Sequence, residues 1–240
     1  MPPENWSQVE GQDWELGTWS AWVKAKPGRR LVLSVPLLVG GWDGKGPASG
    51  PGAHQPVSLE EGAKGTYNDH FRVLAEHLVQ RGLGDTVLRL GWEFNGGWYS
   101  WRAQSEDKAV AFAGYFKQIV TTMRAVPGAE KLTFVWNPCL IWTNYSLEKA
   151  WPGDEYVDYV GVDVYDDSWA PNTYPIPADA TQEEADTIHQ KVWNDIILND
   201  KNHGLALIRD LAARHGNKPL AIPEWGRGQP RRQAGSRRAR

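Results

Sequence analysis

The chain has 240 residues, of which 41% are hydrophobic and 23% are charged, and these are ordinary proportions for a globular chain with room for one large α/β domain. The net charge of −3 gives no general argument for binding to nucleic acid or membranes, and no stretch has the length of a transmembrane helix. The single cysteine, Cys139, excludes an internal disulfide, and the first residues lack the features of a secretory signal.

The first quarter of the chain is predicted to contain one short helix and one buried strand. The helix is expected near Thr18–Lys26, before a Pro-Gly stop. The run Arg30–Val39 is apolar enough to be a parallel strand buried on both faces. Residues 40–56 are rich in Gly and Pro, carry Trp42 and Asp43 near their start, and are expected to form a long functional loop.

From residue 66 onward, helical and strand patterns alternate. Apolar residues at helical spacing predict helices over residues 66–81, 105–126, 181–198 and 204–215. Short apolar runs predict strands over residues 87–90, 132–136, 159–165 and 219–226. This alternation indicates βαβ units and a parallel sheet, with five strands in total where a closed barrel needs eight.

Polar or aromatic residues follow the carboxyl end of every predicted strand. They are Trp42 and Asp43, Glu93, Asn137, Asp163 and Tyr165, and Glu224. In a (β/α)8 (TIM) barrel the active site forms at that face of the sheet. A doubly wound open sheet is the competing arrangement, but it should have a Gly-rich phosphate turn after its first strand, and this sequence has none there.

Glu93 lies where an apolar strand changes into an Asn-Gly-Gly loop, among aromatic residues. Those aromatic residues are Trp92, Trp98, Tyr99 and Trp101. Sugar rings have apolar faces that stack on indole rings, and carboxylates act as acids or nucleophiles at the glycosidic bond. The stretch therefore indicates a sugar site, and a glycosidase of this kind requires a second carboxylate.

Glu224 is the candidate for that second carboxylate. It also ends an apolar strand beside a tryptophan, 131 positions further along (224 − 93). A retaining glycosidase holds its two carboxyl groups roughly 5–5.5 Å apart, a separation that two strand ends of one barrel can supply. The alternative is that both glutamates are solvated loop residues, which is a poor fit to acids that end apolar strands beside tryptophan.

Three segments resemble glycoside hydrolase family 26, whose best-known members are endo-β-1,4-mannanases. Arg89–Trp101 resembles the acid/base segment of that family, Trp151–Tyr165 is similar to its sixth-strand segment, and Pro219–Gly226 is similar to its nucleophile segment. The resemblance extends from Leu31 to Gly226. It implies an incomplete (β/α)8 barrel over residues 1–226, with about strands three to seven present.

The resemblance implies Glu93 as acid/base and Glu224 as nucleophile. It implies that Arg89 lies beside Glu224 and keeps it ionised, with a structural ion pair as the alternative. It also implies that Tyr165 hydrogen-bonds Glu224, with a position at the edge of the core as the alternative.

The other expected site residues are aromatic platforms and polar neighbours. The implied platforms are Trp98, Trp101 and Trp225, with packing as a serious rival for Trp101; Asn95, Asn137 and Asp163 are weaker candidates that serve either the site or loop bracing. Trp92 stands where the family usually has a histidine, which leaves the identity of the substrate open.

Five other tryptophans are expected to pack in the core. They are Trp6, Trp14, Trp19, Trp22 and Trp193. No histidine pair has metal-ligand spacing, and no cofactor is expected.

The sequence thus predicts a retaining, endo-acting glycoside hydrolase whose partner is a β-linked plant polysaccharide, with mannan favoured. The alternatives are a β-glucanase or xylanase on the same scaffold, or a carbohydrate-binding fragment without turnover. No nucleic-acid or membrane partner is expected, and the oligomeric state stays open. A full-length enzyme acting on a polymer is expected outside the cell, although this chain contains no signal peptide.

Residues 227–240 differ sharply from the rest, with six arginines and no acid. The segment reads as a basic, disordered tail, and a nucleic-acid arm is the weaker alternative. The favoured hypothesis is a shifted reading frame in a gene that should continue into an eighth strand. An intact frame ending at Arg240 on resequencing would remove it.

Overall fold

The computed structural model describes residues 5–40, 56–168 and 170–227. Trp42 and Asp43, which the sequence placed at the carboxyl end of the first strand, lie outside the described residues, and so does the tail from residue 228 onward. Arg227 is described, and it closes a strand instead of opening the tail.

The main sheet has five parallel strands in the order β1-β2-β3-β4-β6. They are β1 (Val32–Val35), β2 (Val87–Leu90), β3 (Thr133–Trp136), β4 (Tyr159–Gly161) and β6 (Leu220–Ala221). A separate parallel pair is formed by β5 (Val164–Asp166) and β7 (Trp225–Arg227), which follow β4 and β6 in the chain. Strand order equals chain order, as expected for successive βαβ units of a barrel. The predicted class, an α/β fold with an incomplete (β/α)8 barrel, is confirmed.

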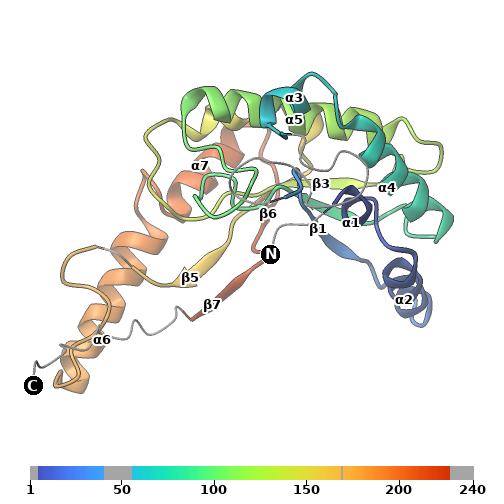
Figure 1. Cartoon of the computed structure of the whole chain (residues 1–240). Coiled ribbons are helices and arrows are strands. Elements are labelled where there is room, and N and C mark those ends of the chain that lie inside the picture. The colour runs from blue at the N-terminus through green and yellow to red at the C-terminus, as the bar shows by residue number, and fades with distance from the viewer. Residues whose placement is uncertain (1–4, 41–55, 169, 228–240) are drawn as a thin grey trace, which may run out of the picture.

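Seven α-helices are found in the described residues. They are α1 (Trp6–Val9), α2 (Asp13–Lys24), α3 (Leu59–Ala63), α4 (Asn68–Gln80), α5 (Glu106–Arg124), α6 (Gln182–Lys191) and α7 (Leu205–Arg214). Two 3₁₀ turns, Leu147–Ala150 and Asp154–Tyr156, precede β4, and a π-helical segment, Val192–Leu198, continues α6. Figure 1 shows α3, α4, α5 and α7 on one side of the sheet, whereas α6 extends away from it beside β5 and β7.

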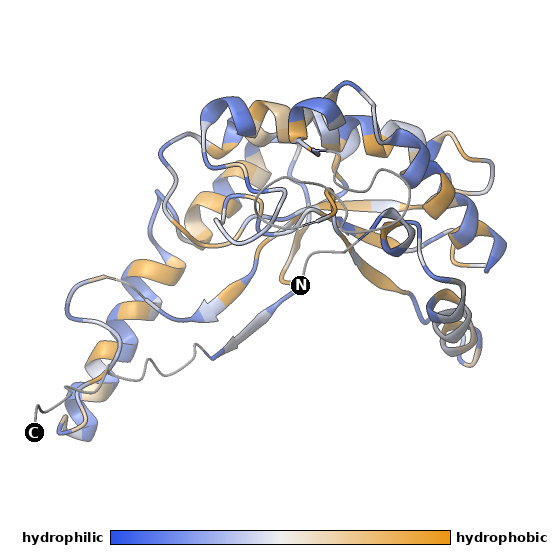
Figure 2. Ribbon diagram, in the orientation of Figure 1, coloured by the Kyte–Doolittle hydropathy of each residue, from blue (hydrophilic) through white to orange (hydrophobic). Residues whose placement is uncertain are grey.

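The core lies between the sheet and the helices on that side. Phe112 and Phe116 of α5 are completely buried in the same hydrophobic cluster as the strand residues Leu88 and Phe134. In Figure 2 the strands of the main sheet are largely hydrophobic, while the helices carry both hydrophobic and hydrophilic turns. The α5 helix begins where the sequence predicts, because the Ser105 side chain accepts a hydrogen bond from the Lys108 amide as an N-cap.

The opposite face of the sheet is open at β1, where the sequence prediction was wrong. The strand covers only four of the ten residues Arg30–Val39, and Val32 and Ser34 on one face are exposed. The apolar run suggested burial on both faces, but within the described residues no second layer covers this face of β1. Burial from both sides is a property of a closed barrel, and it cannot be read from one strand.

Two predicted strands are each divided. The run over residues 159–165 breaks between β4 and β5, where Asp163 pairs with Cys139 in an isolated bridge, and the run over 219–226 breaks between β6 and β7. Both breaks occur at the carboxyl ends of the main sheet, and they leave Asp163 and Glu224 outside its five strands. The regular strand pairing is therefore interrupted at the positions where polar side chains were expected.

Three of the expected packing tryptophans are exposed. Trp6 is buried and Trp19 packs against the core, as predicted. Trp14 and Trp22 lie on α2 with 69% and 50% of their surface exposed, and Trp193 is 37% exposed. The expectation was wrong for these three because α2 and the segment after α6 lie at the periphery, where one face of each helix has no partner among the described residues.

Candidate active site

Arg89 of β2 is the centre of the polar cluster at the carboxyl ends of the strands. Its side chain is 4% exposed. Nη1 donates to Glu224 Oε1 at 2.5 Å and to Ser34 Oγ at 3.2 Å, and Nε donates to Asn137 Oδ1 at 3.1 Å. Nη2 donates to Asp163 Oδ2. One guanidinium thus joins residues from four other segments, which is the fork geometry that arginine provides.

Glu224 is held from two sides. Arg89 contacts one carboxylate oxygen, and the hydroxyl of Tyr165 donates to the other at 3.0 Å. Pairing of Tyr165 with Gly226 in the β5–β7 ladder brings the tyrosine beside the glutamate. The Glu224 side chain remains 38% exposed, so the carboxylate is fixed and still accessible. Burial raises the pKa of Tyr165 to about 12, so its hydroxyl remains a donor.

Glu93 occupies a strained turn at the end of β2. Its φ angle is 52°, in the left-handed region that non-glycine residues rarely adopt, and Gly91 two residues earlier has the same φ. The Glu93 amide donates to the Asn137 carbonyl at 2.7 Å, which fixes this turn on the adjacent strand end. Such a conformation costs of the order of 1–3 kcal/mol and is found where a side chain must be aimed at a functional site.

The environment of Glu93 favours its protonated form. Burial raises the pKa of its carboxyl above the ordinary value, and the negative charge of Glu224 raises it further. Trp98 Nε1 donates to Glu93 Oε2 at 2.6 Å, and this contact and the charge of Arg89 oppose the increase. Glu93 and Glu224 therefore interact electrostatically, although they belong to segments far apart in the chain.

Asp163 is a third carboxyl group in the cluster. Burial raises its pKa to about 7, with Arg89 acting in the opposite direction. Its oxygen Oδ1 is buried without a hydrogen-bond partner among the described residues, while Oδ2 faces Arg89. Asn137 and Asp163 thus both lie in direct contact with Arg89.

The predicted aromatic platforms differ in exposure. Trp225 is 81% exposed and Trp98 is 37% exposed, so both present ring surface to solvent. Trp101 is completely buried, donates from Nε1 to the Trp92 carbonyl at 2.9 Å, and stacks on Tyr99 with ring centroids 4.4 Å apart. The packing alternative is therefore the one that fits Trp101. Trp92 is half-buried, with the Arg89 guanidinium 5.5 Å from its ring centroid.

Asn95 is buried and braces a neighbouring loop. Its amide nitrogen donates to the Cys139 carbonyl and its oxygen accepts from the Cys139 amide, both at 2.9 Å. The bracing alternative therefore accounts for Asn95. Two residues near the cluster were not selected from the sequence, Ser34 and Tyr99. The sequence signal for Ser34 is a lone serine within the apolar run of β1. The signal for Tyr99 is a tyrosine among the tryptophans that follow Glu93.

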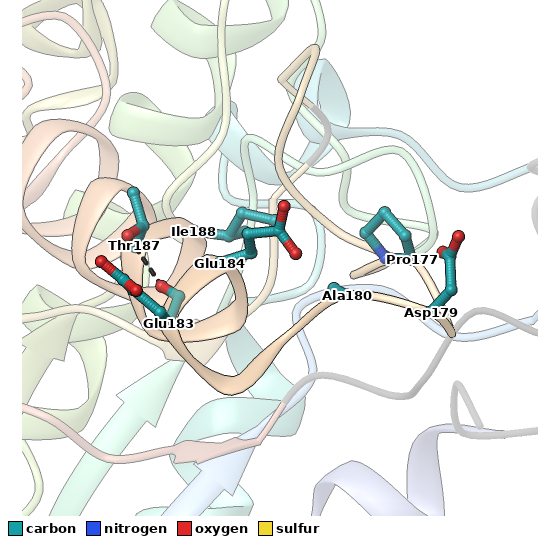
Figure 3. A pocket seen from close by; sticks show the side chains of 7 residues that line it. All are labelled: Pro177, Asp179, Ala180, Glu183, Glu184, Thr187 and Ile188. Atoms are coloured by element: carbon teal, nitrogen blue, oxygen red, sulfur yellow. Dashed lines mark hydrogen bonds between the residues drawn. The ribbon is translucent and has the colours of Figure 1, made fainter.

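A separate hollow of about 570 Å³ lies at the start of α6, away from the Arg89 cluster. It is lined by Pro177, Asp179, Ala180, Glu183, Glu184, Thr187 and Ile188 (Figure 3). It contains none of the predicted site residues. The hydrogen bond drawn in Figure 3 joins the Thr187 hydroxyl to the Glu183 carbonyl within helix α6. Over the described part of the chain, no group of three metal-binding side chains is found, and no helix is suited to crossing a membrane.

Comparisons with known proteins support the resemblance. The family model "Glycosyl hydrolase family 26" matches residues 67–177, a range that contains Glu93 and ends before Glu224. A mannan endo-1,4-beta-mannosidase of Bifidobacterium adolescentis is 25% identical over 175 residues, which cover 70% of this chain and 15% of that protein. The chain therefore spans less than a fifth of the length of this curated relative.

Solved structures share the fold. A Cellulomonas fimi endo-beta-1,4-mannanase superposes with a TM-score of 0.55 and 18% identity over 89% of this chain and 44% of that one. The GH26A protein of a Muricauda species superposes with a TM-score of 0.52 and 16% identity, and the match covers 90% of this chain and 69% of that one. A Bacillus GH26 endo-beta-1,4-mannanase superposes with a TM-score of 0.52 and 21% identity, and the match covers 89% of this chain and 52% of that one. The sequence match over residues 67–177 and the shared barrel fold both support the resemblance of this chain to glycosyl hydrolase family 26.

Proposed function

We propose that this chain carries the active site of a retaining glycoside hydrolase, with Glu93 as acid/base and Glu224 as nucleophile. The observation that carries the proposal is the contrast between the two carboxyl groups. Glu224 lies between a guanidinium and a tyrosine hydroxyl, whereas burial raises the pKa of Glu93. Two carboxyl groups in such different environments are the arrangement that assigns one to nucleophilic attack and the other to proton transfer.

In the proposed reaction, Glu224 attacks the anomeric carbon while Glu93 protonates the leaving glycosidic oxygen. The covalent glycosyl-enzyme forms as the glycosidic bond breaks, and Glu93 becomes a carboxylate. It then removes a proton from water, which attacks the anomeric carbon and releases Glu224. Arg89 and Tyr165 hold the nucleophile in one orientation throughout, because each contacts a different oxygen of its carboxylate.

The proposed substrate is β-1,4-mannan, cleaved within the chain. This proposal rests on the family and on the mannanase relatives, which name that activity for themselves. The exposed rings of Trp98 and Trp225 are proposed as stacking surfaces for sugar units on either side of the cleaved bond. A β-glucanase or xylanase is the second candidate, favoured by Trp92 at the position where the family usually has a histidine.

A carbohydrate-binding protein without turnover is the candidate from another class. The open face of the sheet at β1 favours it, because part of a barrel interior is exposed there. The two contacts that hold Glu224 oppose it, since a protein that only binds sugar has no use for a nucleophile held by two donors.

Reducing-sugar release from mannan, β-glucan and xylan tests the proposal. The unchanged chain should release sugar from mannan fastest, and Glu224→Gln should bind mannan without releasing sugar. Binding by both proteins with release by neither would replace the enzyme with a binding protein. A preference for glucan or xylan would keep the mechanism and change the substrate.

A further inference from the structure

Tyr99 lies near the two carboxyl groups, and the proposed mechanism gives it no role. Its ring stacks nearly parallel on the buried Trp101, with centroids 4.4 Å apart and an interplanar angle of 8°. Its other aromatic neighbour, Trp92, meets it edge to face at 5.0 Å. The rings of Trp101 and Trp92 therefore hold the half-buried Tyr99 in one position.

The hydrogen bond between Trp92 and Tyr99 determines the role of the phenol oxygen. Trp92 Nε1 lies 2.8 Å from the Tyr99 hydroxyl oxygen. An indole N–H can only donate, so the phenol accepts in this contact and its own proton must point elsewhere. Within the described residues the Tyr99 proton has no acceptor, so the hydroxyl is a donor left available at a partly exposed position.

The position of this donor connects it to the candidate active site. The charges of Glu93, Glu224 and Arg89 all act on the Tyr99 hydroxyl, and burial with the two negative charges raises its pKa, so the proton stays in place. Trp92 also faces the Arg89 guanidinium, which contacts Glu224. The hydroxyl thus lies within electrostatic range of the groups that would flank the reacting sugar.

We infer that Tyr99 is a substrate-binding residue that donates a hydrogen bond to a hydroxyl group of the sugar at the catalytic carboxyl groups, and that Trp92 fixes it as a donor. This inference rests on the proposed glycoside hydrolase activity. It also gives Trp92 a role, because its indole acts through the phenol. A site built to bond a substrate hydroxyl discriminates strongly against sugars that lack it, because the bound sugar then covers the donor and leaves it unpaired.

The test compares Tyr99→Phe with the unchanged chain on mannan oligosaccharides. Phenylalanine keeps the stack on Trp101 and removes only the hydroxyl, so kcat/KM should fall about 10- to 100-fold. The melting temperature should stay unchanged. Tyr67→Phe is the matched control, because the Tyr67 hydroxyl also accepts a hydrogen bond from a backbone N–H, that of Ser58 at 3.2 Å. Tyr67 is the N-cap residue of α4 and makes no contact with the carboxyl cluster. It should leave kcat/KM unchanged.

A set of oligosaccharides that each lack one hydroxyl separates binding from a structural role. For one deoxy sugar, Tyr99→Phe should cause no further loss, because the bonded group is already absent. A uniform loss across every deoxy sugar, or less than a twofold loss on mannan, would overturn the inference while leaving the activity in place. Absence of sugar release by the unchanged chain would overturn the proposed function itself.

Discussion

At the scale of single residues, the two glutamates should fail in different ways. Glu224→Ala removes the proposed nucleophile, so turnover should be lost on natural and activated substrates alike. Glu93→Ala should lose mannan hydrolysis but keep measurable activity on aryl glycosides with good leaving groups, which need no protonation. Initial rates on both substrate types measure this difference. Equal losses for the two variants on activated substrates would contradict the assigned roles.

The contact between Trp98 and Glu93 should appear in the pH profile. The indole N–H stabilises the ionised carboxylate and lowers its pKa, so Trp98→Phe should raise that pKa further while keeping a ring. The acid form of Glu93 would then persist to higher pH, and the alkaline limb of kcat/KM against pH should shift upward. A limb that stays in place or moves to lower pH would mean that Glu93 is not the acid whose titration sets it.

The exposed and buried tryptophans should respond oppositely to truncation. Trp225→Ala removes an 81% exposed ring, so it should weaken mannan binding by about 1–3 kcal/mol with little change in melting temperature. Trp101→Ala removes a completely buried ring and should cost about 3–5 kcal/mol of unfolding free energy. Calorimetric binding and thermal melting separate the two effects. A stability loss for Trp225→Ala would remove it from the candidate platforms.

The sequence located most of the residues of this cluster but not their contacts. Glu93, Asn137 and Asp163 could be found because each follows an apolar strand. The left-handed turn at Glu93 and the fourfold use of Arg89 could not, because both depend on segments that are distant in the chain. The burial of Trp101 could not be predicted from the sequence either, since a tryptophan in a loop has the same local sequence pattern whether it packs on a core or faces a sugar.

At the scale of elements, the packing of α3 on α5 depends on one glycine. A Cβ atom added at Gly62 would lie 2.4 Å from the ring of Tyr115, which is completely buried and donates to the Leu37 carbonyl at 2.8 Å. Since this ring cannot move aside easily, Gly62→Ala should destabilise the chain by about 1–3 kcal/mol. Gly17 in α2 is the control, because the nearest atom to an added Cβ is a flexible arginine terminus at 3.9 Å.

Urea unfolding of both variants tests this packing. Gly17→Ala should be neutral or stabilising by about 0.5–1 kcal/mol, because alanine favours a helix interior more than glycine does. If Gly62→Ala were as stable as Gly17→Ala, the two helices would be separated more widely in solution than the close contact at Gly62 requires.

Element type was predictable where the pattern was long, and boundaries were predictable where a cap was present. Helix α5 could be predicted from the helical spacing of its apolar residues and from the N-cap residue Ser105. The parallel sheet could be predicted from the alternation of strands and helices. The short helix α3 was missed because five residues hold too little periodicity. The breaks after β4 and β6 were missed because Val162 and Ile222 continue the apolar runs while the ladder does not.

At the scale of the whole molecule, the sheet has two outer strands in the described part of the chain. Its order runs from β1 to β6, and each carries exposed apolar residues: 59% of Val32 and 51% of Leu220 are exposed. Closed barrels have no edge strands, and an apolar edge with unpaired backbone groups is a template for pairing with another chain. The barrel type could be predicted from the alternation of strands and helices and from the polar residues at the strand ends. The exposure of the outer strands could not, because it depends on neighbours beyond each strand.

We therefore expect the 240-residue chain, purified alone, to associate as its concentration rises and to unfold with low cooperativity. Sedimentation velocity over a concentration series and thermal melting measure both properties. Val32→Lys and Leu220→Lys place a charge at each outer strand, which opposes edge pairing, so the double variant should sediment as a smaller species than the unchanged chain. Neither side chain contacts Arg89 or the glutamates, so the carboxyl cluster should be unaffected. An unchanged chain that stays monomeric at every concentration and melts cooperatively would show that its outer strands are protected in solution, and the association prediction would then be wrong.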